Sequence, residues 1–391
     1  MAIITLKRGK DAAIRRFHPW VFSGAIYNIQ GDVMDGTIVE VRDAKGEFLA
    51  LGHYSKGSIA VRLFSFKKVE LGVHFWEQKL KAALNYRQAI GIANDDNTNA
   101  FRLVHAEGDG LPGLIIDVYN RNAIIQCHSI GMHQEREHIA KALLNVFNGE
   151  LDSIYDKSSE VLPRNYAYGM ENSILHGSGT NAVITENGNQ FYVDWEKGQK
   201  TGFFLDQRDN RQLLGTFAKG KSVLNTFCYS GGFSIYALNQ GATKVDSIDA
   251  SKKAMEWTDK NVSINQNSDA HTSYVGDVLK FFKEDIPSYD VMIVDPPAFA
   301  KSVRKRHNAV QGYKRLNAAA LRKMKSGGIL FTFSCSQVVG RELFYNTVTA
   351  AAIEARRHVK VMKFLSQPAD HPISLFHPEG EYLKGLVLYV E

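Results

Sequence analysis

Cysteine is scarce in this chain, and its three cysteines lie far apart. Cys127, Cys228 and Cys335 form no C-x-x-C pair, and their number is odd. This pattern argues against a disulfide framework and a cysteine zinc site, and we expect no resident metal. Unpaired thiols are typical of the reducing cytoplasm, which is the compartment that the sequence predicts.

Long apolar runs and a strong charge imbalance are also missing. No run approaches the roughly eighteen apolar residues of a membrane span, and residues 1–8 do not resemble a signal peptide. We therefore expect no membrane partner. Lys and Arg number 47 against 41 Asp and Glu, which gives a formal charge of +6. This balance permits an anionic partner such as RNA without indicating one by itself.

The 391 residues are long for one hydrophobic core and predict two or three domains. Residues 1–70 alternate short β-like runs with glycine turns and predict a small, mostly β barrel. Residues 71–185 combine expected helices at 75–90 and 132–147 with short strands, which predicts an α+β module. Residues 186–391 alternate strand and helix and predict an α/β fold with a parallel, doubly wound sheet.

Polar groups stand at the ends of the strands expected in the last region. Ligands of an open parallel sheet bind outside the carboxyl ends of its strands, so we expect these groups to border one crevice. The expected strands of the whole chain lie at residues 37–41, 47–51, 58–64, 101–105, 114–118, 123–127, 153–155, 222–226, 244–248, 273–275, 291–294, 328–334, 359–365 and 385–390.

In the last region, the ends of the first three expected strands, 222–226, 244–248 and 273–275, predict a site for an adenosine. A turn containing Gly231 lets the backbone approach a ligand, but it lacks the G-x-G-x-x-G pattern that binds a dinucleotide pyrophosphate. Asp249 can accept from ribose hydroxyls, and Asp277 from an adenine amino group, with a helix N-cap as its alternative role. S-adenosylmethionine is the cofactor that fits. The residues of the turn expected to contact it are Phe227, Tyr229, Ser230 and Gly231.

An aspartate and a cysteine follow the next two strands. Asp295 begins an Asp-Pro-Pro turn, and Cys335 comes directly after the apolar run 328–334. A thiolate that adds to C6 of cytosine lets C5 attack a sulfonium methyl group, after which a base removes the C5 proton and the thiol leaves. We predict that Cys335 is the nucleophile and that Asp295 forms a hydrogen bond with the cytosine ring. Asp295 and Pro296 are also expected to contact the cofactor, and a buried apolar thiol is the alternative for Cys335.

Basic residues follow the Asp-Pro-Pro turn closely and predict contacts with RNA phosphates, although a solvated helix face is the alternative. A stacked base must be flipped out or unpaired before C6 can be attacked, so an aromatic pocket wall is expected, and Phe299 is the candidate. The residues expected to contact RNA are Arg15, Arg16, Phe299, Lys301, Arg304, Lys305 and Arg306.

These motifs resemble those of the bacterial large-subunit ribosomal RNA cytosine-C5 methyltransferases. The likeness lies in the turn 295–299, in Phe-Ser-Cys-Ser at 333–336, and in the segment 200–208. It extends to a PUA-like opening at 15–24, and it covers nearly the whole chain, with further similar segments at 101–113, 370–372 and 378–385.

The resemblance implies a PUA-like domain at 1–70, an α+β middle module at 71–185 and a Rossmann-like class I methyltransferase domain at 186–391. It implies that the partner is large-subunit ribosomal RNA, naked or partly assembled. Whether the protein forms a homodimer stays open. It also implies that Cys335 is the nucleophile. The residues of the segment 200–208 that it assigns to the cofactor pocket are Asp206, Gln207 and Arg208.

The chain departs from the family pattern at one position, and two alternative functions remain open. Other RNA cytosine-C5 methyltransferases have a second cysteine where this chain has Ala298, so the base that removes the C5 proton is unassigned. A guanine N2 or N7 methyltransferase also uses an Asp-Pro-Pro-aromatic turn but needs no nucleophile. A ribosome-assembly protein that binds RNA without catalysis is the second rival.

Overall fold

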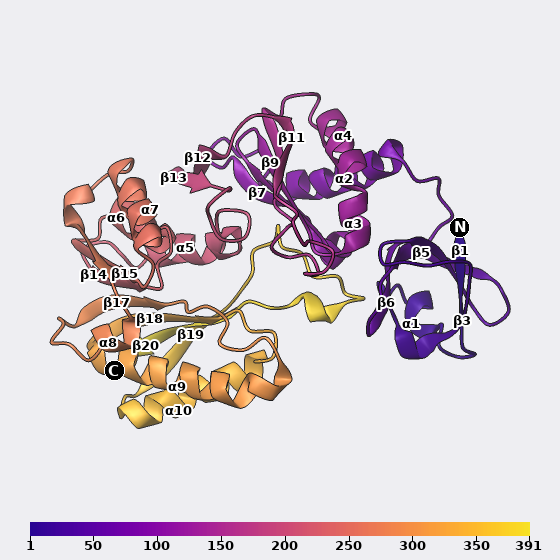
Figure 1. Ribbon diagram of the computed structural model, residues 1–391. Coiled ribbons are helices and arrows are strands. Elements are labelled where there is room, and N and C mark those ends of the chain that lie inside the picture. Colours follow the sequence, from indigo (N-terminus) through magenta and orange to yellow (C-terminus); the bar gives the residue numbers. More distant parts are fainter. The chain divides into compact units, whose positions relative to one another are not determined.

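The computed structural model describes residues 1–391, and the chain divides into two compact units (Figure 1). Unit 1 comprises residues 1–184, 193–205 and 369–380, and unit 2 comprises residues 185–192, 206–368 and 381–391. The chain therefore passes between the units five times. The predicted boundary at 185/186 lies one residue from the first passage, but the prediction that everything after it forms one domain needs correction, because 193–205 and 369–380 belong to unit 1.

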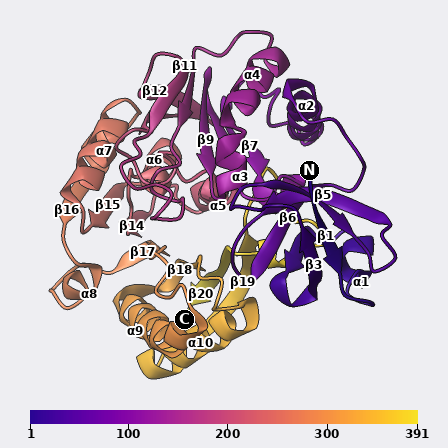
Figure 2. The same cartoon turned by 45° about the vertical axis from the view of Figure 1, so that its right-hand side comes forward.

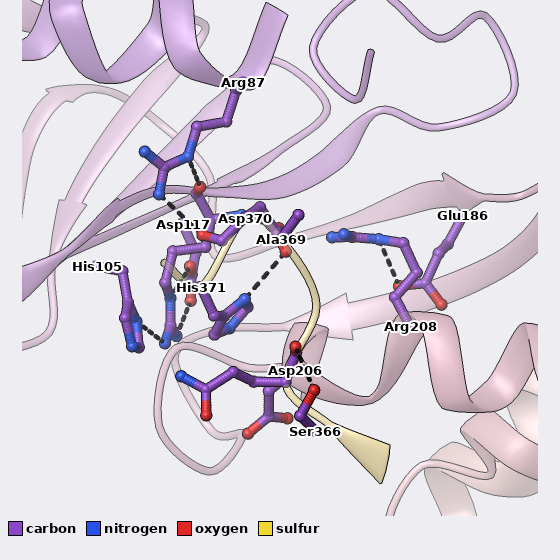
Figure 3. A network of polar contacts seen from close by, with 12 residues as sticks. Arg87, His105, Asp117, Glu186, Asp206, Arg208, Ser366, Ala369, Asp370 and His371 are labelled. Carbon is purple, nitrogen blue, oxygen red and sulfur yellow. Dashed lines mark hydrogen bonds and ion pairs between the residues drawn. The ribbon is translucent and has the colours of Figure 1, made fainter. Parts of the chain in front are cut away.

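Buried polar contacts explain why these two segments belong to unit 1. The Thr201 hydroxyl donates to Asp117 Oδ2 at 2.6 Å. The Asp370 carbonyl accepts from Arg87 at 2.8 Å, and the Asp370 carboxylate accepts from the Arg102 backbone N–H at 2.9 Å (Figure 3). Arg87 is fully buried, and a buried guanidinium needs such partners. Hydrogen bonds to buried polar groups of the residues before 185 therefore hold both segments in unit 1.

The first part of unit 1 is a six-stranded sheet in the order β2-β6-β5-β4-β1-β3, in which only β1 and β4 pair in parallel. Its core includes Ile4, Val39 and Val61. The predicted strands are confirmed as β4, β5 and β6, whereas β1, β2 and β3 went unpredicted. The strands β2 and β3 each bury at most one side chain. Its elements are β1 (Ala2–Leu6), α1 (Ala12–Arg15), β2 (Trp20–Phe22), η1 (Ser23–Ala25), β3 (Ile26–Gln30), β4 (Ile38–Arg42), β5 (Phe48–Tyr54) and β6 (Ile59–Ser65).

The second part of unit 1 is a five-stranded sheet in the order β11-β10-β9-β8-β7 with three helices. The predicted helix at 132–147 is two helices that meet at Glu135, whose carboxylate accepts from Trp76 Nε1 at 2.9 Å. The predicted strands are confirmed, and β11 is an addition. The elements are α2 (Val73–Ala89), β7 (Ala100–His105), η2 (Ala106–Asp109), β8 (Leu114–Tyr119), β9 (Asn122–Cys127), α3 (Ile130–Gln134), α4 (Arg136–Val146), β10 (Ser153–Asp156) and β11 (Ser173–Gly177).

A hairpin that the sequence analysis missed contains the first two passages between the units. Its strands are β12 (Asn181–Glu186) and β13 (Asn189–Asp194). Asn187 and Gly188 between them both have positive φ, 48° and 77°, as a two-residue hairpin turn requires. The Asn-Gly pair was therefore a readable signal for this hairpin.

Unit 2 contains a seven-stranded sheet in the order β16-β15-β14-β17-β18-β20-β19. The first five of these strands are parallel, and β20 is antiparallel to both neighbours. Helices α6 and α7 cover one face and α9 and α10 the other, which is the predicted doubly wound arrangement (Figures 1 and 2). All predicted strands of this region are confirmed within a few residues.

The strands of unit 2 are β14 (Ser222–Thr226), β15 (Lys244–Asp249), β16 (His271–Val275), β17 (Tyr289–Val294), β18 (Met324–Ser334), β19 (Val359–Ser366) and β20 (Lys384–Val390). Its helices are η3 (Leu205–Gln207, which begins one residue before the unit), α5 (Arg208–Gly215), α6 (Gly232–Asn239), α7 (Lys252–Ser263), η4 (Ser268–Ala270), α8 (Val278–Phe281), η5 (Val303–Lys305), α9 (Arg306–Lys323) and α10 (Arg341–Ala355). The short η6 (Pro378–Gly380) belongs to unit 1.

The direction of β20 brings its first residues to the edge of the sheet where β18 ends. Lys384 lies opposite Ser334, and Gly385 lies opposite Phe333. A Cβ added at Gly385 would lie 2.5 Å from Phe333 Cδ1 and 3.1 Å from the carbonyl oxygen of Thr332. Position 385 therefore has no room for a side chain, because Phe333 is fully buried and cannot move aside.

We expect Gly385→Ala to lower the free energy of unfolding by about 1–3 kcal/mol, because the added methyl group overpacks a closed core. Urea denaturation measures the change. Gly340→Ala is the matched control, since an added Cβ there meets no atom within 4 Å. Equal stability of the two variants would contradict the close packing described for Gly385.

Candidate active site

The turn after β14 has the strained backbone that close approach to a ligand requires. Phe227, Tyr229 and Gly231 have φ values of 56°, 49° and 79°. The Tyr229 carbonyl accepts from the Thr258 hydroxyl at 2.8 Å, and the Ser230 carbonyl accepts from Asn261 Nδ2 at 2.8 Å. Helix α7 therefore holds the turn in this conformation, at the switch point of the sheet between β14 and β17.

Asp249 is the last residue of β15 and is bound to the same turn. Its Oδ2 accepts from the Tyr229 backbone N–H at 3.1 Å, and its Oδ1 accepts from the Ser251 N–H at 2.9 Å. An ionised carboxylate offers about four acceptor positions, so capacity remains for two hydroxyl donors. Asp249 is half-buried. A fixed, half-buried carboxylate of this kind fits the ribose of an adenosine.

Asp277 follows β16 and fulfils the alternative role that the sequence left open. Its Oδ1 accepts from the Lys280 N–H at 2.9 Å and thereby caps α8. The side chain is exposed. The cap uses one oxygen only, so a contact with the cofactor stays a prediction.

The segment 206–208 connects the cofactor side of the sheet with the Asp-Pro-Pro turn. Gln207 Nε2 donates to Asp295 Oδ2 at 2.9 Å, and Gln207 Oε1 accepts from Asn210 Nδ2 at 2.6 Å. The Asp206 carboxylate accepts from the Tyr382 hydroxyl at 2.8 Å. The structure thus brings Gln207 to Asp295 and places Tyr382, which sequence reasoning missed, against Asp206, while the contacts of these residues with the cofactor stay a prediction.

Arg208 has a different environment from the one expected. Its Nε lies 3.5 Å from the fully buried Glu186 carboxylate (Figure 3). Arg211 contacts the same carboxylate at 2.9 and 2.7 Å. The Tyr236 hydroxyl donates to the same carboxylate at 3.0 Å, and burial raises the pKa of Tyr236. Glu186 therefore ties α5 to α6, and the Arg208 guanidinium is part of this buried ion cluster.

Cys335 and Asp295 follow adjacent parallel strands. Val294 of β17 pairs with Thr332 of β18, so the turns after the two strands share one edge. The Ser336 hydroxyl donates to the Ala300 carbonyl at 2.7 Å and links these turns. Pro296 is buried behind Asp295.

Among the three cysteines, Cys335 alone is partly exposed. Cys127 and Cys228 are buried, and burial raises the pKa of both thiols. A buried thiol of raised pKa is a packing group and not a nucleophile. Cys335 is therefore the cysteine with the access that reaction requires.

The residues expected to contact RNA fall into two groups. In unit 2, Phe299 is 37% exposed and its ring lies 4.6 Å from that of Tyr313. The exposed basic residues nearby stand at the start of α9, where the helix dipole repels cations and attracts anions. An anionic partner would relieve this repulsion. These basic residues are Lys301, Arg304, Lys305 and Arg306.

The second group is in unit 1 and differs from the expectation. Arg15 lies 2.6, 2.7 and 3.3 Å from the carboxylates of Asp11, Asp43 and Glu47. Its charge is therefore balanced within the protein. Arg16 is exposed, and its Nε donates to the Ala12 carbonyl at 3.1 Å.

Two negative findings complete the description. The side chains of His, Cys, Asp and Glu form no group of three or more that could hold a metal ion. None of the helices combines the length and the apolar character needed to cross a bilayer.

Two known protein families match separate ranges of the chain. Residues 4–66 match the PUA-like domain, and residues 160–374 match the S-adenosylmethionine-dependent methyltransferases. The chain is 38% identical to the ribosomal RNA large subunit methyltransferase I of Shewanella amazonensis, over 99% of each chain. It is 39% identical to the protein of that name from Alteromonas mediterranea, over 100% of this chain and 99% of the relative.

Solved structures agree in fold. A methyltransferase in complex with SAH has a TM-score of 0.85 at 24% identity, covering 99% of this chain and 100% of that one. A Streptococcus mutans methyltransferase covers the same shares with a TM-score of 0.84. The chain belongs to the S-adenosylmethionine-dependent methyltransferase family, with a PUA-like domain before it, and S-adenosylmethionine is its cofactor. The predicted fold class and cofactor are thereby confirmed.

We expect Asp249→Ala to weaken S-adenosylmethionine binding at least about tenfold, because charge-assisted hydrogen bonds of about 1.5–3 kcal/mol each are lost. Isothermal titration calorimetry measures the dissociation constant. The control is Asp269→Ala, which removes a carboxylate from η4, next to the start of β16 and not at the carboxyl ends of the strands. Wild-type affinity of the Asp249 variant would contradict its assignment to the cofactor.

Proposed function

We propose that this enzyme methylates C5 of a cytosine in large-subunit ribosomal RNA, with Cys335 as the nucleophile. The observation that carries the proposal is the partly exposed Cys335 thiol at the end of β18, beside the Asp295 turn at the end of β17. The name of the relatives, ribosomal RNA large subunit methyltransferase I, supports the choice of RNA.

The reaction assigns Cys335 a bond that forms and then breaks. Its thiolate adds to C6 of cytosine, and the electron pair of the C5–C6 double bond becomes available at C5. S-adenosylmethionine supplies an electrophilic methyl group, which C5 takes up. A base then removes the C5 proton, the double bond re-forms, and the thiolate leaves. The base remains unassigned, since Ala298 cannot serve.

Asp295 supports this chemistry by orienting the ring. Gln207 Nε2 donates to its Oδ2, so the carboxylate is used as an acceptor. An ionised carboxylate accepts from the exocyclic amino group of cytosine and discriminates against uracil, which has a carbonyl oxygen there. Gln207 thereby fixes the direction from which Asp295 meets the substrate.

The RNA partner is supported by charge and by aromatic surface near the same edge of the sheet. The exposed basic residues at the start of α9 fit phosphate groups. Phe299 fits the flipped base, because its ring is supported from behind by Tyr313. Burial raises the pKa of Tyr313 to about 12, so this support is uncharged at neutral pH. Within unit 1, Arg16 is an exposed cation that fits a phosphate group, whereas the paired Arg15 fits a structural role better.

We expect Cys335→Ser to abolish methylation, because a hydroxyl is far less ionised than a thiol near neutral pH. Bisulfite sequencing of large-subunit ribosomal RNA incubated with enzyme and cofactor reads the product. A transcript containing 5-fluorocytidine should give a covalent protein–RNA adduct with the wild-type enzyme, since the C5 fluorine cannot be removed as a proton.

Cys127→Ser is the control for the loss of a thiol as such, because Cys127 is buried in β9. A fully active Cys335→Ser enzyme would refute the proposal and favour methylation of guanine at N2 or N7, which needs no nucleophile. Mass spectrometry of the methylated nucleoside distinguishes the two products.

We expect Phe299→Ala to lower kcat/KM for RNA about tenfold or more and to leave the affinity for S-adenosylmethionine unchanged, since stacking on one base contributes about 1–3 kcal/mol. Steady-state kinetics and calorimetry measure the two effects. Tyr389→Ala is the matched control, because Tyr389 is also aromatic and 37% exposed but lies near the far end of β20. Parallel losses of both quantities at Phe299 would count against its role.

A further inference from the structure

Lys384 is a buried lysine beside the nucleophile, and the function described so far does not use it. It is the first residue of β20, lies opposite Ser334 at the end of β18, and is 4% exposed. Its position at the reactive edge follows from the antiparallel direction of β20, whose start meets the ends of the parallel strands. Lysine is rarely buried to this degree without a partner that compensates its charge.

The ammonium group holds the turn that contains Cys335. Lys384 Nζ donates to the carbonyl of Ser336 at 2.7 Å and to the carbonyl of Val339 at 2.8 Å. Both acceptors are neutral, and Lys384 makes no ion pair with a carboxylate. Neutral carbonyls satisfy hydrogen-bond donors but do not neutralise a buried charge.

The Cys335 thiol is the group beside Lys384 that can become the missing anion. The negative charge of a Cys335 thiolate favours the protonated form of Lys384, and it is the largest favourable charge effect on this lysine. Such coupling is reciprocal, so the ammonium in turn favours the thiolate form of Cys335. The thiol proton passes to solvent, and the lysine keeps its own.

We propose that Lys384 is a positioning residue that fixes the Cys335 turn and favours the ionised form of the Cys335 thiol. The inference deepens the proposed function, because it rests on Cys335 being the nucleophile. Without such a cation a thiol has a pKa of about 8.5, and the carboxylate of Asp295 beside it opposes ionisation further. Below about pH 8 the lysine supplies a counter-charge that is present before cofactor and RNA bind.

The other charged groups around Lys384 leave this role intact. Glu381 and Arg341 also act on it, with opposite effects, and they form an ion pair with each other. Tyr313, which interacts with Cys335, stays protonated because burial raises its pKa to about 12. Burial lowers the pKa of Lys384 to about 8. The ammonium is therefore present below about pH 8, and its effect on the thiol is lost as the pH rises through that value.

The test is the pH dependence of Cys335 alkylation by iodoacetamide in the full-length protein. We expect Lys384→Met to raise the thiol pKa by about one unit and to slow alkylation about tenfold at a pH below it. Lys384→Arg, which keeps the charge, should react nearly as the wild type does. Lys363→Met, on the exposed strand β19, is the control and should have no effect. Cys335→Ala supplies the blank for the two buried cysteines.

An unchanged thiol pKa in a folded Lys384→Met variant would overturn the inference and leave Lys384 as a structural tie only. An Arg variant that behaves like the Met variant would overturn it as well, because the charge would then not be the cause. A purely structural role would lower the thermal unfolding midpoint of Lys384→Met without moving the thiol pKa.

A second measurement avoids Lys384 variants and so does not depend on their folding. Carbon-13 NMR of labelled lysine follows the titration of Lys384 in the wild type and in Cys335→Ala. We expect the lysine pKa to fall when the thiolate is removed, and an unchanged value would overturn the inference. Both measurements are independent of methylation. If Cys335→Ser methylates RNA normally, the proposed function fails whatever the thiol pKa is.

Discussion

The hydrogen-bonded register of β18 between its two neighbours is the constraint on which the site depends. On one side, parallel pairing with β17 sets the Cys335 turn beside the Asp295 turn. On the other side, antiparallel pairing with β20 sets Lys384 opposite Ser334. A shift of β20 by one residue would turn Lys384 to the opposite face of the sheet, because side chains alternate along a strand. Gly385, which is closed in by Phe333, opposes such a shift.

Side chains of unit 2 connect the segment 206–208 with the Asp295 turn and with the segment that precedes β20. Gln207 binds Asp295, whose turn lies beside the Cys335 turn, and the neighbouring Asp206 binds Tyr382, two residues before Lys384. The segments 206–208 and 381–384 thus contact each other and the turns of β17 and β18. Hydrogen bonds therefore join the segment 206–208 to the Asp295 turn and to Tyr382, which lies close to Lys384 in the sequence.

Much of the candidate site could be predicted from the sequence, because the carboxyl ends of parallel strands lie at the same edge of a sheet. Cys335 and Asp295 directly follow apolar runs, and Asp249 ends an expected strand, so the local pattern sufficed to place these three residues. Lys384 and Glu186 were missed, because their partners are far away in the sequence and no local pattern announces them. The PUA-like sheet was half predicted, since strands such as β3 bury no side chain and lack the alternation that marks a strand.

The five passages of the chain between the units have a consequence for biosynthesis. Each unit takes residues from both halves of the sequence, and β18 gains its second neighbour only from residues 384–390. During synthesis one edge of the strand that leads to Cys335 therefore stays unpaired until residues 384–390 have left the ribosome. A growing or truncated chain therefore lacks both the completed sheet and the lysine beside the thiol.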